Sequence, residues 1–134
     1  MKIKKNFSLK ERLLSFRHAA RGLGIVAASQ HNARIHLTAM GAALMLSYWL
    51  QIGRIKFCII ILAIVMVFAA EALNTTCEIL VNMISPRYSA RAGRAKDVSA
   101  GAVLVTSIGA LVVGLIIFGP PLLQNFQSWT SHGS

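Results

Sequence analysis

The first apolar pattern in the sequence has the period of an amphipathic helix. Leu9, Leu13, Phe16 and Leu23 recur at helical spacing, while basic residues occupy another side of the same stretch. The pattern predicts a helix over about residues 8–29. A basic amphipathic helix fits the surface of an anionic membrane leaflet, and packing on a cytoplasmic domain is an equally good interpretation.

Three later stretches are nearly continuous apolar runs with the length of membrane spans. The first run would extend roughly 27 Å as a helix, close to the ~30 Å hydrocarbon core of a bilayer. We therefore predict a surface helix followed by three transmembrane helices, in one membrane domain over residues 1–134. The predicted spans cover about residues 35–52, 57–84 and 98–118.

The segment Gly119-Pro-Pro121 follows the last predicted span. Proline has no amide donor for a continuing helix, and the residue before it resists the helical region. We therefore expect the third span to end here and residues 119–134 to form a tail.

Composition favours an integral membrane protein of the all-α class. Hydrophobic residues make up 55% of the chain and charged residues only 13%, which is too apolar for an ordinary soluble protein of this size. The formal net charge is +10, a balance that elsewhere would suggest a nucleic-acid partner. Here the basic residues flank the apolar runs, where topology and anionic lipid account for them, so we expect no nucleic acid.

The basic residues also predict an orientation. Most of them precede the first span or lie in the predicted loop of residues 85–97, and none follows Lys96. The N-terminus and this loop are therefore expected in the cytoplasm and the C-terminus outside. Counted from Phe57 at the outer boundary, Glu71 lies about 21 Å along the second span and Glu78 about 31 Å, at the cytoplasmic headgroup level.

One polar stripe interrupts the second span, in the segment Glu71-Ala-Leu-Asn-Thr-Thr-Cys-Glu78. On a helix Glu71, Asn74 and Glu78 fall within about 60 degrees of one another. A charged residue at the middle of a spanning helix costs roughly 2.5 to 3.5 kcal/mol, so such residues usually line a pathway or a reactive site. The stripe is therefore the candidate functional site.

The two carboxylates of the stripe suit different tasks. They are about 10 Å apart in helical rise, too far to bind one ion without ligands from elsewhere. Glu71 suits proton abstraction from a lipid hydroxyl, and Glu78 suits Mg²⁺ held together with nucleotide phosphates. The alternative is that both only pair with Arg34 or Lys96 and hold helices together. A channel is less favoured, because one short stripe does not line a continuous pore.

Three segments carry a resemblance to the small prokaryotic diacylglycerol kinase and undecaprenol kinase family of integral membrane enzymes. The resemblance covers about residues 9–118, and the motif pair ExxNxxxE and AKD at this separation is highly specific. It implies a homotrimer in the bacterial inner membrane that transfers the ATP γ-phosphate to a lipid alcohol with Mg²⁺, at sites shared between subunits. The segments are Glu71-Ala-Leu-Asn-Thr-Thr-Cys-Glu78, Gly93-Arg-Ala-Lys-Asp-Val-Ser-Ala-Gly-Ala-Val103 and Asn32-Ala-Arg-Ile-His36.

The resemblance also implies residue roles. Glu71 matches the general base of the family, Asn74 an adjacent active-site amide, and Glu78 a ligand of both metal and nucleotide. Lys96 and Asp97 match nucleotide contacts. A lysine suits such a position because its charge neutralises phosphate oxygens in a transfer that depends mainly on positioning and electrostatics.

Three positions depart from the family pattern. Gln30 stands where the family has a second metal-binding glutamate, and its amide oxygen is a weaker Mg²⁺ ligand than a carboxylate. A Tyr-His pair of the family appears as Tyr88-Ser89, and an aspartate appears as Asn82. Tyr88 and Gln30 are still expected among the nucleotide contacts, with Gln30 also a metal ligand.

Two functions follow from this comparison with the family. The first is an ATP-dependent lipid kinase, with undecaprenol favoured over diacylglycerol because Arg34-Ile-His36 looks more like the undecaprenol kinase branch. The second is a non-catalytic or weakened membrane homologue that binds lipid or nucleotide or acts as a partner subunit. Nucleotide binding without phosphoryl transfer would distinguish the second from the first.

Overall fold

The computed structural model describes residues 9–29, 31–87 and 89–131, and the regular structure in them is entirely helical. The expected all-α class is therefore confirmed. The helices are α1 (Leu9–Ser29), α2 (His31–Trp49), α3 (Arg54–Ile84) and α4 (Ala90–Ser131).

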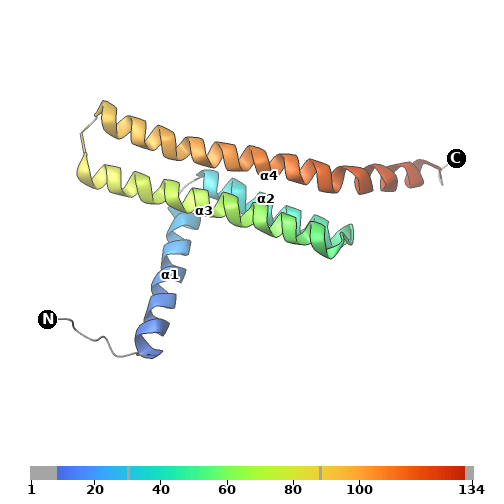
Figure 1. The fold of residues 1–134 in the computed structure, drawn as a ribbon, viewed down its shortest axis with the longest axis horizontal. Helices are drawn as coiled ribbons and strands as arrows, with labels where there is room; N and C mark the ends of the chain where they lie inside the picture. Colours follow the sequence, from blue (N-terminus) through green and yellow to red (C-terminus); the bar gives the residue numbers. More distant parts are fainter. Residues whose placement is uncertain (1–8, 30, 88, 132–134) are drawn as a thin grey trace.

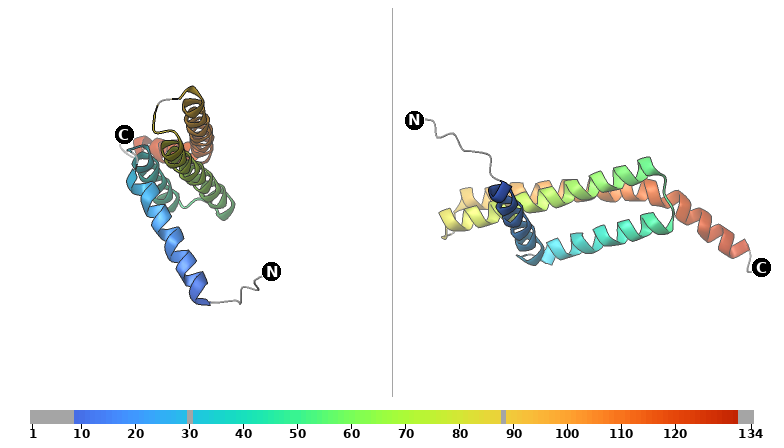
Figure 2. Two further views of the ribbon diagram at one scale, coloured as in Figure 1. Left: turned by 90° about the vertical axis from the view of Figure 1, so that its left-hand side faces the viewer. Right: turned by 90° about the horizontal axis from the view of Figure 1, so that it is seen from below.

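Three of the helices form an elongated bundle, and α1 stands apart from it (Figure 1). α3 and α4 are a long antiparallel pair, and α2 runs back along the N-terminal part of α3 (Figures 1 and 2). α1 leaves the bundle at a steep angle (Figure 1), and it contacts both α2 and α3. This is the arrangement expected of a surface helix beside helices that cross a membrane, although the membrane placement of α1 stays a prediction.

Two helices in the described part of the chain, α3 and α4, are long and apolar enough to cross a membrane. α2 does not meet the same criterion, because its first turns contain His31, Asn32, Arg34 and His36. Length and composition thus support two of the three predicted spans. The third predicted span, within α2, stays a prediction.

The start of α4 differs from the prediction. The third span was expected to begin at Val98 after a loop of residues 85–97, but α4 already begins at Ala90. Alanine, arginine and lysine are strong helix formers, so the basic residues of this region extend the helix although they are not apolar. Lys96 and Asp97 consequently lie on a helix and not in a loop.

The end of α4 also differs from the prediction. Pro120 and Pro121 lie inside the helix, which continues to Ser131, so the expectation that the helix ends here was wrong, while the end of the membrane span stays a prediction. Each proline removes one amide donor, but the residues that follow can restart the hydrogen-bonding pattern. Figures 1 and 2 show α4 changing direction towards its red, C-terminal part. A bend is the usual outcome when a helix continues through proline.

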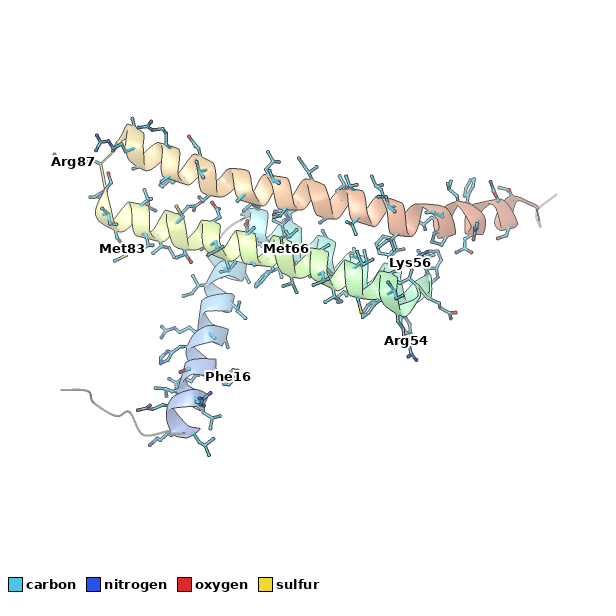
Figure 3. The ribbon with its side chains drawn as sticks, viewed as in Figure 1. Phe16, Arg54, Lys56, Met66, Met83 and Arg87 are labelled. Atoms are coloured by element: carbon cyan, nitrogen blue, oxygen red, sulfur yellow. The ribbon has the colours of Figure 1, made fainter. Side chains whose placement is uncertain are left out.

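A small apolar cluster holds the bundle together near the α2–α3 turn. Ile60 of α3 packs with Ile117 and Phe118 of α4, and all three are buried. Most other large apolar side chains point outwards, including Met66, which projects from α3 (Figure 3). A surface of this kind is available to lipid or to a neighbouring subunit. The half-buried side chains around the cluster are Ala43, Leu46, Leu50, Ile52, Ile64 and Val113.

Basic residues mark both ends of α3. Arg54 and Lys56 lie at its N-terminal end, and Arg87 lies just beyond its C-terminal end (Figure 3). Between these ends, the charged residues of α3 are Glu71 and Glu78. The acidic pair is therefore isolated in the C-terminal half of the helix.

Candidate active site

Buried polar side chains gather on one face of α3. Glu71 is only 2% exposed, Thr75 is 4% exposed and Asn74 is 7% exposed. Residues three, four and seven positions apart share one side of a helix, so Glu78 continues the same face. The stripe predicted from sequence is therefore buried at Glu71 and Asn74 and half-buried at Glu78.

Two hydrogen bonds connect α4 to Glu78 through Asn74. Ser99 Oγ of α4 donates to Asn74 Oδ1 at 2.7 Å, and Asn74 Nδ2 donates to Glu78 Oε1 at 3.2 Å. An ionised carboxylate only accepts hydrogen bonds, so the amide nitrogen must face Glu78 and the amide oxygen must face Ser99. Asn74 thus holds one carboxylate oxygen of Glu78 at a fixed place on the helix face.

Glu71 differs from Glu78 in its hydrogen bonding. Among the described residues, no hydrogen-bond partner reaches its buried Oε1, and the same is true of the neighbouring Thr75 Oγ1. A buried polar atom without a partner costs stability, and in native proteins such an atom often marks a functional group. The alternative that Glu71 merely holds helices together through an ion pair finds no support at this oxygen.

Lys96 lies in the second turn of α4, close to α3. Its Nζ donates to Asn82 Oδ1 at 2.8 Å, and Cys77 Sγ of α3 donates to the carbonyl of Ala95 at 3.6 Å. Asn82 follows Glu78 by one helical turn, so the lysine is held beside the segment that carries the Glu78 carboxylate. Asp97 is exposed and lies next to Lys96.

Gln30 and Tyr88 lie outside the described residues, and their predicted roles stay predictions. On either side of residue 30, Val26 and Ala33 are buried. α1 contacts both α2 and α3.

The described residues could supply part of the coordination of an Mg²⁺ ion, but not a complete set of ligands. Within the described ranges, no group of three or more His, Cys, Asp or Glu side chains gathers at one point. Mg²⁺ usually keeps several waters and binds through one or two carboxylates plus substrate phosphates. Glu78, half-buried and oriented by Asn74, fits the carboxylate of such a site.

Two residues of the site were missed by the sequence reasoning, namely Ser99 and Thr75. Ser99 follows Lys96 by three residues and therefore shares its helix face. This signal was overlooked because residues 85–97 were interpreted as a loop. Thr75 follows Glu71 by four residues and shares its helix face, so the same spacing could have included it in the stripe.

Comparisons with known proteins complete the description of the site. The family described as prokaryotic diacylglycerol kinase matches residues 17–118. This range contains α2, α3 and the part of α4 that carries Lys96, Asp97 and Ser99. The match ends just before the proline pair of α4.

Individual relatives agree with the family match. The chain is 37% identical over 108 residues to undecaprenol kinase of Bacillus subtilis (strain 168), covering 81% of this chain and 88% of the relative. It is 37% identical over 113 residues to diacylglycerol kinase of Synechocystis sp., covering 84% of this chain and 65% of the relative. It is 32% identical over 75 residues to diacylglycerol kinase of Escherichia coli (strain K12), covering 56% of this chain and 62% of the relative.

Proposed function

The chain belongs to the prokaryotic diacylglycerol kinase family of lipid kinases, and on this premise we propose how its site works. It transfers the γ-phosphate of ATP to the hydroxyl of a membrane lipid alcohol, with Mg²⁺ bound at Glu78. The observation that carries this proposal is the contrast between two carboxylates on one helix face. Glu71 Oε1 is buried and has no hydrogen-bond partner within the described part of the chain, whereas Glu78 accepts a hydrogen bond from Asn74.

Glu71 is proposed as the general base. Its carboxylate accepts the proton of the lipid hydroxyl as that oxygen attacks the γ-phosphorus, which increases the nucleophilicity of the oxygen. The unpartnered Oε1 leaves a lone pair available for this proton. Burial of the side chain keeps water, a competing phosphoryl acceptor, away from the reacting oxygen.

Glu78, Asn74 and Lys96 are proposed to position the nucleotide. The bound Mg²⁺ would neutralise charge on the β- and γ-phosphate oxygens. Glu78 would hold that ion, and Asn74 would keep the carboxylate in place. Lys96 would add a positive charge beside the phosphates, with Asp97, Tyr88 and Gln30 as further contacts. Phosphoryl transfer depends mainly on such positioning and electrostatics.

The membrane arrangement is also part of the proposal. We propose that α2, α3 and α4 cross the bacterial inner membrane, with the N-terminus in the cytoplasm and the C-terminus outside. The apolar surfaces of α3 and α4 support this placement, as does the absence of Lys and Arg after Lys96. We further propose a homotrimer with shared active sites, in which the outward apolar side chains of the bundle contact neighbouring subunits.

The preferred substrate is proposed to be undecaprenol. The similarity to a relative named undecaprenol kinase, of which 88% is covered, supports this choice. Relatives named diacylglycerol kinase are covered over 65% and 62% of their length. Diacylglycerol is therefore the second candidate acceptor.

A radiolabelled phosphate transfer assay tests the proposal. Purified protein in detergent-lipid micelles is incubated with γ-labelled ATP, Mg²⁺ and one lipid alcohol at a time, including undecaprenol and diacylglycerol. We expect labelled lipid phosphate, with the highest kcat/KM for undecaprenol. Failure to label any lipid, while the Bacillus subtilis relative labels its own substrate in parallel, would contradict the kinase proposal.

The alternative function is a weakened or non-catalytic homologue that binds lipid or nucleotide or acts as a partner subunit. The observation that favours it is Gln30, a neutral side chain where the family resemblance calls for a glutamate. This alternative predicts that the nonhydrolysable analogue AMP-PNP binds with Mg²⁺ while no lipid is phosphorylated. Calorimetric titration of AMP-PNP beside the transfer assay separates the two functions.

A further inference from the structure

We propose that Ser99 is a positioning residue of the site, because its hydroxyl fixes the orientation of the Asn74 amide and thereby the Glu78 carboxylate. This inference rests on the proposed function only where it says that Glu78 serves the metal and nucleotide. The hydrogen-bonded connection itself, from α4 through Asn74 to Glu78, is a feature of the structure.

The Asn74 amide can occupy its place in two ways, related by a half-turn that exchanges oxygen and nitrogen. Only one of them is compatible with Glu78, because a carboxylate repels the amide oxygen and accepts from the amide nitrogen. In that orientation Oδ1 points at Ser99 and needs a donor. The Ser99 hydroxyl, 2.7 Å away, supplies it. Ser99 therefore selects the productive orientation without touching the metal ligand.

The burial of Asn74 makes the orientation of its amide depend on Ser99. Asn74 is 7% exposed, so water has little access to replace a missing donor. In a site closed to water, an amide oxygen without a donor destabilises its own orientation and favours the rotated amide. Rotation would turn the amide oxygen towards Glu78 Oε1, and the carboxylate would move away from its place on the helix face.

The Ser99 hydroxyl also links Asn74 to the turn that carries Lys96. Ser99 Oγ is 2.9 Å from the carbonyl oxygen of Lys96, a second acceptor for its single proton. One hydroxyl thus lies between the residue proposed to contact phosphate and the amide that holds the proposed metal ligand. The two halves of the nucleotide site, on α3 and on α4, meet at this side chain.

Replacing Ser99 tests the inference in the purified full-length enzyme. Ser99→Ala is expected to raise the half-saturating concentration of Mg-ATP by about 3- to 10-fold, the usual weight of one hydrogen bond, because the Asn74 amide is no longer fixed in the orientation that donates to Glu78. The KM for the lipid alcohol is expected to change by less than about twofold, since Glu71 is untouched. Ser99→Thr keeps the hydroxyl and is expected to restore Mg-ATP affinity.

Thr106→Ala is the matched control. The Thr106 hydroxyl lies on the same helix and, among the residues that the structure describes, donates only to carbonyls of its own helix, at Ala102 and Val103. Its loss is expected to leave the Mg-ATP requirement unchanged. The inference fails if Ser99→Ala leaves this requirement unchanged, if Ser99→Thr does not restore it, or if Thr106→Ala raises it equally.

A double-mutant cycle keeps the inference testable without kinase activity. Thermal unfolding in detergent and calorimetric binding of Mg-AMP-PNP are compared for Ser99→Ala, Asn74→Ala and the double variant. If Ser99 acts through Asn74, Ser99→Ala has no further effect once Asn74 is replaced. Additive effects would overturn the inference. A wild-type protein that phosphorylates no lipid but shows this coupling would overturn the proposed function alone.

Discussion

The two halves of the α3–α4 pair differ in what they bury. Near the α2–α3 turn, Ile60 packs against Ile117 and Phe118 in a wholly apolar contact. In the half towards the α3–α4 loop, α3 buries Glu71, Asn74 and Thr75. The first half is joined by apolar contacts, whereas in the second half side-chain hydrogen bonds also join the two helices, beside buried apolar residues such as Val103.

This difference suggests that the apolar half of the helix pair contributes mainly to stability and the polar half mainly to the proposed reaction. In a membrane the hydrophobic effect does not drive helices together, so the apolar half depends on close packing. The polar half gains individual hydrogen bonds but keeps the unpartnered Glu71 Oε1, which costs stability. Substitutions in the polar half should therefore change turnover more than stability, and those in the apolar half the reverse.

The largest effect is expected from Glu71→Gln. The amide keeps the shape of the side chain but cannot accept the substrate proton, so kcat should fall by at least about 100-fold. The unfolding temperature should be unchanged or higher, because a neutral amide is less costly to bury than a carboxylate. The transfer assay and thermal unfolding measure the two quantities. Glu11→Gln on α1 is the control, and equal turnover in Glu71→Gln would refute the role as base.

Glu78→Gln should have the next largest effect. A neutral amide binds Mg²⁺ more weakly than a carboxylate, so kcat/KM for ATP should fall by about 10- to 100-fold. Raising the Mg²⁺ concentration should recover part of this loss, whereas it should not rescue Glu71→Gln. Initial rates over a Mg²⁺ titration show the difference. Equal behaviour of the two variants would mean that the carboxylates do not have separate roles.

Ile60→Ala tests the apolar half. Loss of packing against Ile117 and Phe118 should lower the free energy of unfolding by about 1 to 2 kcal/mol, less than in a water-soluble core because lipid also solvates apolar groups. Turnover at a permissive temperature should stay within about twofold of wild type. The control is Leu62→Ala, since Leu62 is 64% exposed on the same helix. A loss of turnover well beyond twofold, with the free energy of unfolding unchanged, would contradict the distinction between the halves.

The smallest effect is expected from Gln30→Glu. A carboxylate at this position would add a stronger oxygen ligand and should lower the half-saturating Mg²⁺ concentration several-fold. Kinase rates over a Mg²⁺ titration report the change, with Gln127→Glu near the C-terminus as the control. No change in the Mg²⁺ requirement would show that residue 30 is not a ligand in this protein.

The acidic stripe and the helical class could be predicted from the sequence because both depend on local rules. A carboxylate in an apolar run is conspicuous by its cost, and helical spacing alone places Glu71, Asn74 and Glu78 on one face. The ends of α4 could not be predicted from hydropathy. Helix formation at residues 90–97 depends on intrinsic propensity, which an apolar run does not show.

The partner of Asn74 could not be predicted for a different reason. Ser99 is 25 residues away in sequence, and only the register of two antiparallel helices brings the side chains together. A single sequence gives the face of each helix but not how far one helix is shifted along the other. The same limit applies to Lys96 and Asn82, which are joined across the pair.

In the proposed membrane arrangement, the proline pair of α4 indicates how deep the site lies in the membrane, because backbone carbonyls that lose their amide partners need to be hydrated. Pro120 and Pro121 deprive the carbonyls of Ile116 and Ile117 of their usual amide partners. A bare carbonyl in hydrocarbon costs several kcal/mol, so in the proposed membrane arrangement the carbonyl of the exposed Ile116 belongs where water or lipid headgroups can reach it. Ser99 lies about 27 Å back along the helix, nearly the full ~30 Å of hydrocarbon. In the proposed membrane arrangement, two prolines outside the family match thus mark one membrane boundary, and the polar site lies at the other.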